Sequence, residues 1–540
     1  MHRRQFIQAS IAAGAAGVTP SLVLAREAGW SAGQVSHLVP AANHDRFIIK
    51  AGFHRSVVPS LLVADQRIPG RPTDTTDTGF AFDVQGLAPD TTYELSLVQG
   101  RENLCDPWSL KTFPAPDAEP EHVRLLVFTC AGGHPLMSEG ENSIFLPMDI
   151  RRRLLNRGLA FQPDVLIAIG DHIYWDQRTS LESSRPQRRE LAAEIYHSVG
   201  MLDRTRPALG NPNEALLKVV AGEQIVPLYG TTLRSTPSYF INDDHDYFEN
   251  DEATERFVTL PPHHYQKSFF RFMRDHYFPE FLPDPGRWQA LPGDVGNGLN
   301  ESFGALRWGR LGEVLMYDCA GYLSLKGEVA GLVPLEVESW LAERTAQETV
   351  RQLIHVPSHP FGWSAGKWRE WYPDVADTGK HGSTVARMGV EGEQFALTTD
   401  RPKFMWQSGW WSQHQRLLKS LSEQRNRVAM VLSGDLHATG HGQIIRSGDL
   451  DLSSNPVNTI ITGTLGTGTV WPSQVRGTPP VAASHLRLES PAPITERNGF
   501  TLVDLTPDAV RVRLFAWRRE QASSEAIDTL EPYHDVTLGR

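Results

Sequence analysis

The sequence contains little cysteine. Only Cys105, Cys130 and Cys319 occur among 540 residues. Three cysteines cannot provide the dense disulfide framework of small secreted domains. The chain must therefore be stabilised mainly by packing, and its 40% of hydrophobic residues is enough for a large core. The length suggests about two or three domains.

The sequence also lacks an excess of positive charge and a long apolar run. Its net charge of −11 argues against a general nucleic-acid binder, which would carry a basic face. Bound metal ions could still attract a small phosphorylated molecule, because they reverse the local field. Beyond the N-terminal segment, no run approaches the roughly 20 apolar residues that cross a bilayer, so no stable membrane insertion is expected.

Residues 1–25 are expected to be a targeting signal rather than part of the fold. Arg3 and Arg4 precede a weakly apolar run rich in Ala and Gly, and Val23 and Ala25 form a small-residue cleavage pattern. The segment resembles a twin-arginine signal. That resemblance implies the twin-arginine export machinery as a partner and a periplasmic or secreted bacterial protein. A basic N-terminus before a surface helix is the alternative.

Residues 34–116 are expected to form a small all-β domain. Short β-rich runs such as FIIKAGF, SLLVADQRI and TTYELSLVQG are separated by Gly, Pro, Asp and Asn. The piece FDVQGLAPDTTYELSLV resembles the tyrosine corner of fibronectin type III-like sandwiches. The Pro-rich stretch FPAPDAEPEHV ends this unit.

Residues 120–540 show a different, α/β pattern. RLLVFTC and PDVLIAIGD are nearly continuous apolar runs, typical of strands buried on both faces. Further apolar runs end in polar clusters, and helix-like stretches lie between them. This alternation predicts a layered α/β enzyme with its site at the carboxyl ends of the strands. Residues 247–300, rich in aromatics and Pro, are expected to be an insertion that could roof the site.

Four strand ends carry side chains that commonly bind metals. A carboxylate directly after a buried strand needs hydrogen bonds, a cation or a metal. A helix N-cap would explain one such cluster, whereas four in one domain predict converging metal ligands. Gly132 and Gly133 would let the first loop bend close to the others. The clusters are Cys130, Asp171 with Tyr174, Asp243 to Asp246, and Asp435 with His437.

The order of these clusters resembles the calcineurin-like metallophosphatases, and most closely the alkaline phosphatase D (PhoD-like) family. In that family the first block is a cysteine, the third is D-D-H-[DE] and the last is S-G-D-x-H, as in Cys130, DDHD and SGDLH here. The resemblance implies an α/β fold, a four-layer β-sandwich flanked by helices, behind a fibronectin type III-like sandwich. It also implies a metallophosphoesterase that acts on small phosphomonoesters or phosphodiesters.

The resemblance implies two metal positions. A thiolate and a tyrosinate suit Fe³⁺ at the first, whereas carboxylates suit Ca²⁺, Mn²⁺ or Mg²⁺ at the second. His359 is a further candidate, because the wider superfamily has a metal-binding histidine before the last block, and His355 is its alternative. The first position would be held by Cys130, Asp171, Tyr174 and His437, and the second by Asp171, Asp244 and Asp435.

The implied reaction is attack of a metal-activated water on phosphorus. His245 is expected to protonate the leaving group, and Asp246 to orient its imidazole. One departure concerns an arginine that the family carries after the third motif, where this chain reads MYDCAGY; Arg234 is a candidate replacement. A metal-dependent hydrolase of a non-phosphate substrate and a metal-binding module without catalysis remain alternatives.

Overall fold

The computed structural model describes residues 29–138, 143–175, 181, 186–248, 260–284, 286–287, 291–377 and 396–539. Ala32–Arg540 form one compact unit, distinct from Met1–Ser31. The expected export signal, residues 1–25, lies outside the described residues.

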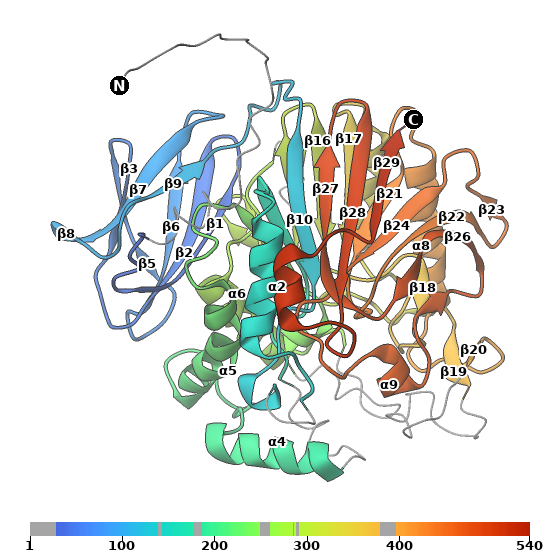
Figure 1. Ribbon diagram of the computed structural model, residues 1–540, viewed down its shortest axis with the longest axis horizontal. Coiled ribbons are helices and arrows are strands. Elements are labelled where there is room, and N and C mark those ends of the chain that lie inside the picture. The colour runs from blue at the N-terminus through green and yellow to red at the C-terminus, as the bar shows by residue number, and fades with distance from the viewer. Residues whose placement is uncertain are drawn as a thin grey trace, which may run out of the picture. The chain divides into compact units, whose positions relative to one another are not determined.

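Two small antiparallel sheets form the first part of the compact unit (Figure 1). One has the order β1 (Val35–Ala42), β2 (Arg46–Phe53), β6 (Gly79–Gln85) and β5 (Arg71–Pro72). The other has the order β4 (Gln66–Pro69), β3 (Ser60–Val63), β7 (Thr92–Gln99) and β8 (Glu102–Asn103), with β9 (Trp108–Lys111) paired to β7. The Tyr93 hydroxyl accepts a hydrogen bond from the Ala88 N–H at 2.7 Å, as a tyrosine corner requires.

Two larger sheets form the central layers of the rest of the chain. The first has six strands: β12 (Ser238–Ile241), β11 (Val165–Ile169), β10 (Val123–Thr129), β27 (Asn498–Leu505), β28 (Ala509–Trp517) and β29 (His534–Gly539). The second runs β15 (Phe303–Trp308), β16 (Gly312–Tyr317), β17 (Gln352–Pro357), β21 (Met430–Ser433), β24 (Val457–Thr462), β22 (Thr439–Ser447) and β23 (Leu450–Asp451), and β26 (Leu486–Thr495) pairs with β22.

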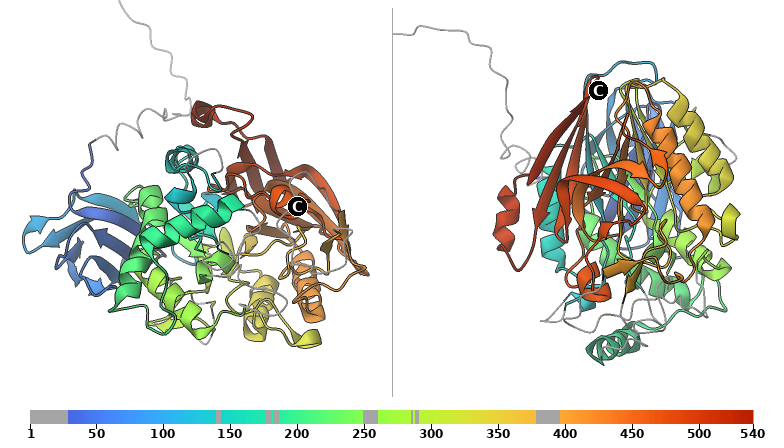
Figure 2. Two further views of the ribbon diagram at one scale, coloured as in Figure 1. Left: turned by 90° about the horizontal axis from the view of Figure 1, so that it is seen from below. Right: turned by 90° about the vertical axis from the view of Figure 1, so that its right-hand side faces the viewer.

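Helices cover the outer faces of these two sheets, as the right-hand view of Figure 2 shows. On one side lies α2 (Met148–Leu159), and on the other lie α7 (Leu335–Ala346) and α8 (Ser408–Ser422). The buried residues of α8, Trp410, His414, Leu417 and Leu421 among them, recur at helical spacing and form its core-facing stripe. The strands β10 and β11 lie where the apolar runs RLLVFTC and PDVLIAIGD predict them.

The remaining elements are shorter or lie further from the two sheets. They comprise α4 (Pro186–Val199), α5 (Pro212–Tyr229), α6 (His264–Tyr277) and α9 (Pro472–Arg476), and the short strands β13 (Asp294–Gly296), β14 (Leu299–Asn300), β18 (Trp363–Ser364), β19 (Val375–Asp377), β20 (Ala396–Thr398) and β25 (Val481–Ala482). Four 3₁₀ turns in the described residues are η1 (Pro135–Met137), η2 (Asp244–Tyr247), η4 (Gly327–Val329) and η5 (Ser524–Thr529). In the part of the chain that the structure describes, no helix has the length and apolarity of a membrane span.

The segment from residue 247 to residue 300 was expected to be an insertion that could roof the site, and this stays a prediction. Its described part contains α6, which contacts β2 and β6 of the N-terminal sheets as well as the turn η2. Residues 249–259, a large part of the predicted roof, lie outside the described residues. The described helix therefore braces the site from the side of the small sandwich.

An ion-pair cluster joins the small sandwich to α6. The Lys50 side chain on β2 is fully buried, and its Nζ lies 2.9 Å from Asp275 Oδ1 and 2.8 Å from Glu280 Oε1. Burial would raise the pKa of Asp275, but the Lys50 and Arg71 cations outweigh it and hold that pKa below its ordinary value. Because these contacts tie residues of both parts, 34–116 and 120–540 pack as one unit, and their independence as domains stays a prediction.

Loss of the Lys50 charge should therefore destabilise the whole unit. Lys50→Met leaves the buried Glu280 carboxylate without its cation, so we expect the free energy of unfolding to fall by about 3 kcal/mol. Denaturant titration followed by fluorescence measures this change. The exposed pair Lys111–Asp90 provides the control, because Lys111→Met should change stability by less than about 0.5 kcal/mol. Equal effects of the two variants would contradict the inferred role of Lys50.

Candidate metal centre

The strand ends that carry the predicted ligands meet at one edge of the two large sheets. In the parallel register, Thr129 is level with Ile169, and Ile169 is level with Ile241. Cys130, Asp171 and Asp243 therefore follow neighbouring strands at the same edge. Gly434, after β21 of the other sheet, lies so close that an added Cβ would be 2.2 Å from Thr129 Oγ1. Only glycine permits this approach of the two sheets.

The backbone is left-handed at four of the predicted ligands. The φ angles are 48° at Cys130, 55° at Asp171, 70° at Asp435 and 47° at His437. Residues with a Cβ rarely adopt this region, and such residues cluster at functional sites where the surroundings enforce the conformation. The left-handed conformation is unfavourable at these four residues, and it turns their side chains toward one another.

The first group of side chains is the one predicted for the first metal position. The Tyr174 hydroxyl lies 2.8 Å from Asp171 Oδ2 and 3.1 Å from His437 Nε2. Cys130 Sγ lies 3.3 Å from the same Asp171 oxygen. His437 Nδ1 lies 2.9 Å from the Val470 carbonyl, so this nitrogen carries the proton and Nε2 presents its lone pair to the group. A thiol, a phenol, a carboxylate and an imidazole thus converge in one place.

The protonation of this group depends on burial. Desolvation, followed by the nearby Asp171 carboxylate, raises the pKa of Cys130 and of Tyr174 well above their ordinary values. Burial and then Asp244 likewise raise the pKa of Asp171. A cation bound here must displace these protons, so its affinity should increase with pH. The donor set fits a highly charged metal ion, because three of its members can become anions.

The second group contains four buried carboxylates. Oxygen atoms of Asp171, Asp243, Asp244 and Asp435 lie within 4.8 Å of one another. Each residue is at most 2% exposed. Asp435 Oδ2 and both carboxylate oxygens of Asp243 make no hydrogen bond to the described part of the chain. Buried oxygens without hydrogen-bond partners suit a divalent cation, so the residues fit the second predicted position.

Asp243 was not predicted as a ligand, although it precedes Asp244 in the DDHD motif. The sequence could not rank the two aspartates, because neighbouring residues of a loop can both turn inward. His359 was predicted as a ligand, and the structure places its Nδ1 3.0 Å from Asp243 Oδ1, at the border of the carboxylate group. His355, its alternative, instead lies 2.9 Å from the Thr345 hydroxyl and away from the group.

Two cations that the sequence analysis missed reach the carboxylates. Arg369 is fully buried, and its Nη2 contacts Asp244 Oδ2 and lies 3.0 Å from Asp435 Oδ1. The Lys367 amine contacts the same Asp435 oxygen. Burial would raise the pKa of Asp244, but Arg369 and Lys367 outweigh it and hold that pKa well below its ordinary value. No motif in GKWREW distinguishes these two residues from ordinary surface charges.

Arg234, the candidate replacement for the missing family arginine, does not lie at the edge of the sheet where the carboxylates meet. It precedes β12, whereas Asp243 and Asp244 follow that strand, so it lies at the opposite end of the sheet. Its Nη1 donates to the Thr231 carbonyl at 3.0 Å. Asp318, in the MYDCAGY block, accepts hydrogen bonds from the amides of Ala320 and Gly321, both at 2.8 Å. The Asp318 carboxylate thus stabilises the turn that follows β16.

His245 and Asp246 lie in the turn η2, directly after the ligand candidate Asp244. His245 is 9% exposed, and its ring lies 4.3 Å from the Tyr174 ring, measured between centroids. The role expected for Asp246, to orient the His245 imidazole, stays a prediction for that side chain. Its oxygens accept from three backbone amides, those of Asp171, His172 and Asp243, at 2.8 to 2.9 Å. Asp246 therefore fixes the loops that carry the ligands.

Two residues of the covering helices also support these loops. On α5, Gln224 Oε1 accepts from the Gly133 N–H at 2.7 Å and from the Tyr174 N–H at 2.8 Å. On α2, Arg151 Nη1 donates to the Gly133 carbonyl at 2.8 Å. Gln224 and Arg151 lie inside helices and outside the predicted motifs, so nothing in the sequence marks their role.

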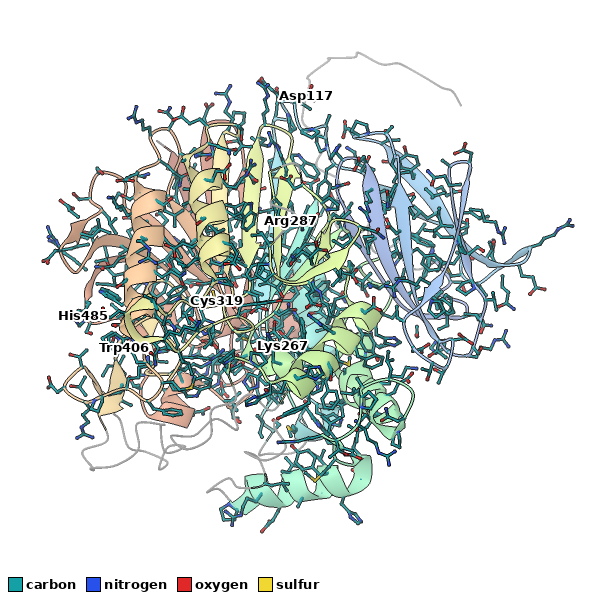
Figure 3. The ribbon with its side chains drawn as sticks, turned by 180° about the vertical axis from the view of Figure 1, so that it is seen from behind. Asp117, Lys267, Arg287, Cys319, Trp406 and His485 are labelled. Atoms are coloured by element: carbon teal, nitrogen blue, oxygen red, sulfur yellow. The ribbon has the colours of Figure 1, made fainter. Side chains whose placement is uncertain are left out.

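The other two cysteines have structural positions. Cys319 is fully buried in the core, as Figure 3 shows, and burial raises the pKa of its thiol. Cys105 is 4% exposed, and burial raises the pKa of its thiol to about 11. Both thiols are therefore neutral at ordinary pH. In the part of the chain that the structure describes, Cys130 is the one cysteine that belongs to a group of potential metal ligands.

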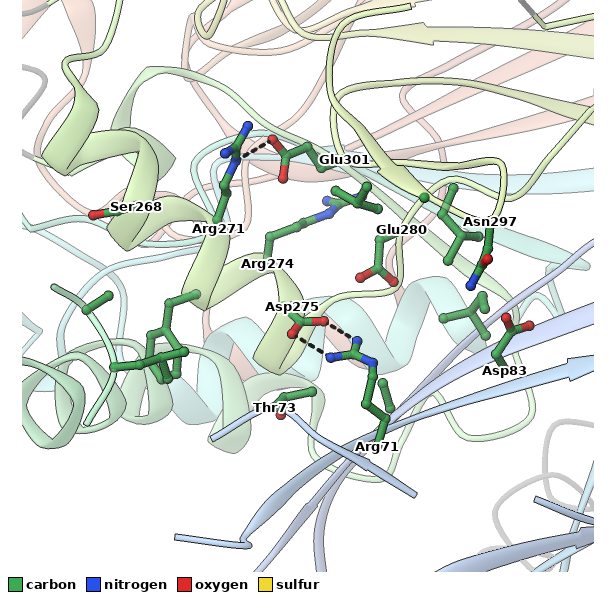
Figure 4. A pocket seen from close by; sticks show the side chains of 18 of the residues that line it. Arg71, Thr73, Asp83, Ser268, Arg271, Arg274, Asp275, Glu280, Asn297 and Glu301 are labelled. Atoms are coloured by element: carbon green, nitrogen blue, oxygen red, sulfur yellow. Dashed lines mark hydrogen bonds and ion pairs between the residues drawn. The ribbon is translucent and has the colours of Figure 1, made fainter. Parts of the chain in front are cut away.

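A cavity of about 950 Å³ lies away from these groups, between the N-terminal sheets and α6 (Figure 4). Its wall contains the ion pairs Arg71–Asp275 and Arg271–Glu301. None of the predicted site residues lines it. Arg274, also in the wall, donates to the Phe240 carbonyl at 2.5 Å at the end of β12. The cavity wall thereby supports the strand that leads to Asp243.

Two solved structures have the same fold as this chain. A structure of PhoD aligns with a TM-score of 0.54 and 12% identity, over 94% of this chain and 90% of that chain. A purple acid phosphatase isolated from yellow lupin (Lupinus luteus) seeds aligns with a TM-score of 0.50 and 11% identity, over 93% and 74%. No family model and no curated protein matches the sequence. The predicted PhoD-like metallophosphatase fold is confirmed.

The close approach of the loops gives a prediction for Gly132. A Cβ at this position would lie 2.7 Å from the His172 backbone, beside the Asp171 carbonyl. Gly132→Ala should therefore push the Cys130 loop away from Asp171 and lower the free energy of unfolding by about 1–3 kcal/mol. Denaturant titration measures the change. Gly539→Ala is the control, because its Cβ would meet only an ordinary contact at 3.6 Å. An unchanged stability of Gly132→Ala would contradict this geometry.

Proposed function

We propose that this protein is a metal-dependent phosphoesterase. The observation that carries the proposal is the convergence of Cys130, Tyr174 and His437 on the Asp171 carboxylate, beside a second group of buried carboxylates. The fold is the one found in PhoD and in a purple acid phosphatase. The same fold with a matching donor set favours hydrolysis of phosphate esters over other metal-assisted reactions.

The proposed centre holds two ions. Fe³⁺ suits the first group, because a thiolate and a phenolate stabilise a trivalent ion, and Ca²⁺, Mn²⁺ or Mg²⁺ suits the carboxylates. Asp171 would be shared by the two ions, since its Oδ2 faces the first group and the residue also belongs to the second group. When bound, such ions lower the pKa of a water molecule and polarise a phosphoryl group.

His245 is the proposed general acid for the leaving group. Its position next to Asp244 and against the Tyr174 ring places an imidazole beside both ligand groups. An imidazole titrates near neutral pH and can give a proton to a departing alkoxide. Asp246 contributes indirectly, because it holds the backbone amides of the loops that carry Asp171 and Asp243.

The proposed location is the bacterial periplasm or the exterior. The paired Arg3 and Arg4 and the following Ala/Gly-rich run support export through the twin-arginine machinery. That route carries folded proteins, so it would allow the buried metal centre to be loaded before export. The proposed substrates are small phosphomonoesters or phosphodiesters.

The direct test is hydrolysis of aryl phosphate esters. We expect the purified protein to hydrolyse aryl phosphomonoesters or phosphodiesters at alkaline pH, and exhaustive chelation to abolish this activity, because the buried carboxylates need cations to bind the anionic ester. The loaded protein should also absorb visible light, since a phenolate donates charge to Fe³⁺. Full activity after metal removal would overturn the proposal, and hydrolysis of carboxylic but not phosphate esters would favour a different hydrolase.

The proposed role of His245 predicts a dependence on the leaving group. His245→Ala should lower kcat by about 10²- to 10⁴-fold on esters of poorly acidic alcohols, the usual scale of general acid catalysis. The loss should shrink on esters of acidic phenols, because these leave without a proton. His172→Ala is a control for removal of a nearby buried imidazole, since His172 Nε2 bonds to the Ile241 carbonyl instead. Equal losses on both kinds of ester would exclude the acid role.

A further inference from the structure

The Arg369 guanidinium lies among the carboxylates that fit the second metal ion. Its Nη2 contacts Asp244 Oδ2 and lies 3.0 Å from Asp435 Oδ1, and its Nη1 lies 3.5 Å from Asp243 Oδ1. Arg369 thus approaches three of the four acids of that group, and all of these side chains are at most 2% exposed. The single guanidinium of Arg369 therefore occupies carboxylate oxygens that could otherwise coordinate the second metal ion.

Lys367 reaches the same place from the same short segment. Its Nζ contacts Asp435 Oδ1, the oxygen that Arg369 Nη2 also approaches. Residues 367 and 369 are two positions apart, directly after β18 (Trp363–Ser364). The segment supplies two cations to the carboxylate group.

The backbone of this segment is fixed, although the guanidinium is held by few bonds. The Glu370 carboxylate accepts from the Ser364 hydroxyl at 2.5 Å and from the Ala365 N–H at 2.9 Å. By contrast, Arg369 Nε and Nη1 make no hydrogen bond to the described residues. A guanidinium can donate five hydrogen bonds. Arg369 is therefore anchored at its backbone and bound at its tip chiefly by the carboxylates themselves.

We propose that Arg369, supported by Lys367, is a tethered cation that competes with the second metal ion for Asp244 and Asp435. The inference rests on the proposed metal centre and does not depend on which reaction that centre performs. An ion and a guanidinium cannot share the same oxygen lone pairs at ligand distance. The second ion binds only by displacing Arg369, so its affinity is lowered by the strength of the arginine contacts.

The consequence is a centre whose two positions differ in affinity. In the first group, Cys130 and Tyr174 bond to Asp171, and Tyr174 also bonds to His437, so the first ion displaces protons rather than the Arg369 contacts. The carboxylate group takes up its ion reversibly, and only where the divalent ion is abundant enough to displace the side chain. Displacing Arg369 costs every divalent ion the same free energy, so the affinities of Ca²⁺, Mn²⁺ and Mg²⁺ for the carboxylate group are all lowered by the same factor.

The test measures Mn²⁺ binding to the intact, iron-loaded protein, with Mn²⁺ alone as the probe. Arg369→Met removes the competing charge and keeps an unbranched side chain. We expect Mn²⁺ to bind this variant about 10- to 100-fold more tightly than it binds the wild type, because contacts between buried charged groups are of this strength. Lys367→Met should give a smaller increase. The visible band of the first ion should not change.

Arg416→Met is the matched control, because it breaks an arginine–carboxylate pair with Glu338 at the surface. It should leave Mn²⁺ affinity unchanged. An unchanged or weaker affinity of Arg369→Met overturns the proposal, as does failure of both wild type and variant to bind Mn²⁺. If Arg369 instead holds the substrate's phosphoryl group, inhibition by inorganic phosphate weakens while Mn²⁺ affinity stays the same, and this outcome also rejects the competition.

A second measurement covers the case in which Arg369→Met fails to fold. In the wild type, Mn²⁺ should release Lys367 from Asp435, so acetylation of Lys367, followed by mass spectrometry, should rise with Mn²⁺ concentration. Acetylation of Lys111, far from the site and exposed, should stay constant. A constant value at Lys367 overturns the proposal. Both measurements are made without substrate, so a protein that fails to hydrolyse phosphate esters would refute the proposed function and leave this inference standing.

Discussion

Mutual repulsion of buried carboxylates is the constraint on which the rest of this structure depends. Asp171, Asp243, Asp244, Asp246 and Asp435 are each at most 4% exposed, and all lie at the meeting point of the two large sheets. Each ionised carboxylate that is removed from water costs several kcal/mol unless it is compensated. The fold places five of these carboxylates together. The residues around them can be described by the hydrogen bonds or positive charges with which they offset this cost.

The compensation takes three forms. Asp246 accepts from backbone amides, and this fixes the loops. Asp171 accepts from the Tyr174 hydroxyl and the Cys130 thiol. Asp244 and Asp435 meet the cations Arg369 and Lys367. The left-handed conformations of the ligand loops and the glycine contact at Gly434 are the structural cost of this arrangement. The small sandwich, joined to α6 through Lys50, stabilises the loop after β12 from the outside.

The second and third forms of compensation have different consequences for function. Protons on Cys130 and Tyr174 can be exchanged for a metal ion, and uptake then depends on pH. Side-chain cations are exchanged at a cost that the chain itself sets, because Arg369 remains covalently attached at high effective concentration. Under the proposed competition, the two neighbouring groups, which share Asp171, would bind their ions with different affinities. This difference is a property of the segment after β18, which lies outside the sequence motifs.

The sequence by itself determined the buried strands, the covering helices and the strand-end positions of Cys130, Asp171, Tyr174, Asp435 and His437. It could do so because hydrophobic periodicity and glycine turns are local, and the carboxyl ends of parallel strands share one edge. Only the tertiary structure decided which residues compensate those charges. Arg369, Lys367, Gln224 and Arg151 come from segments without a motif, and the role of Asp246 depends on amides of a loop that is distant in sequence. Such partners are selected by distance in space, which the spacing of residues along the chain does not encode.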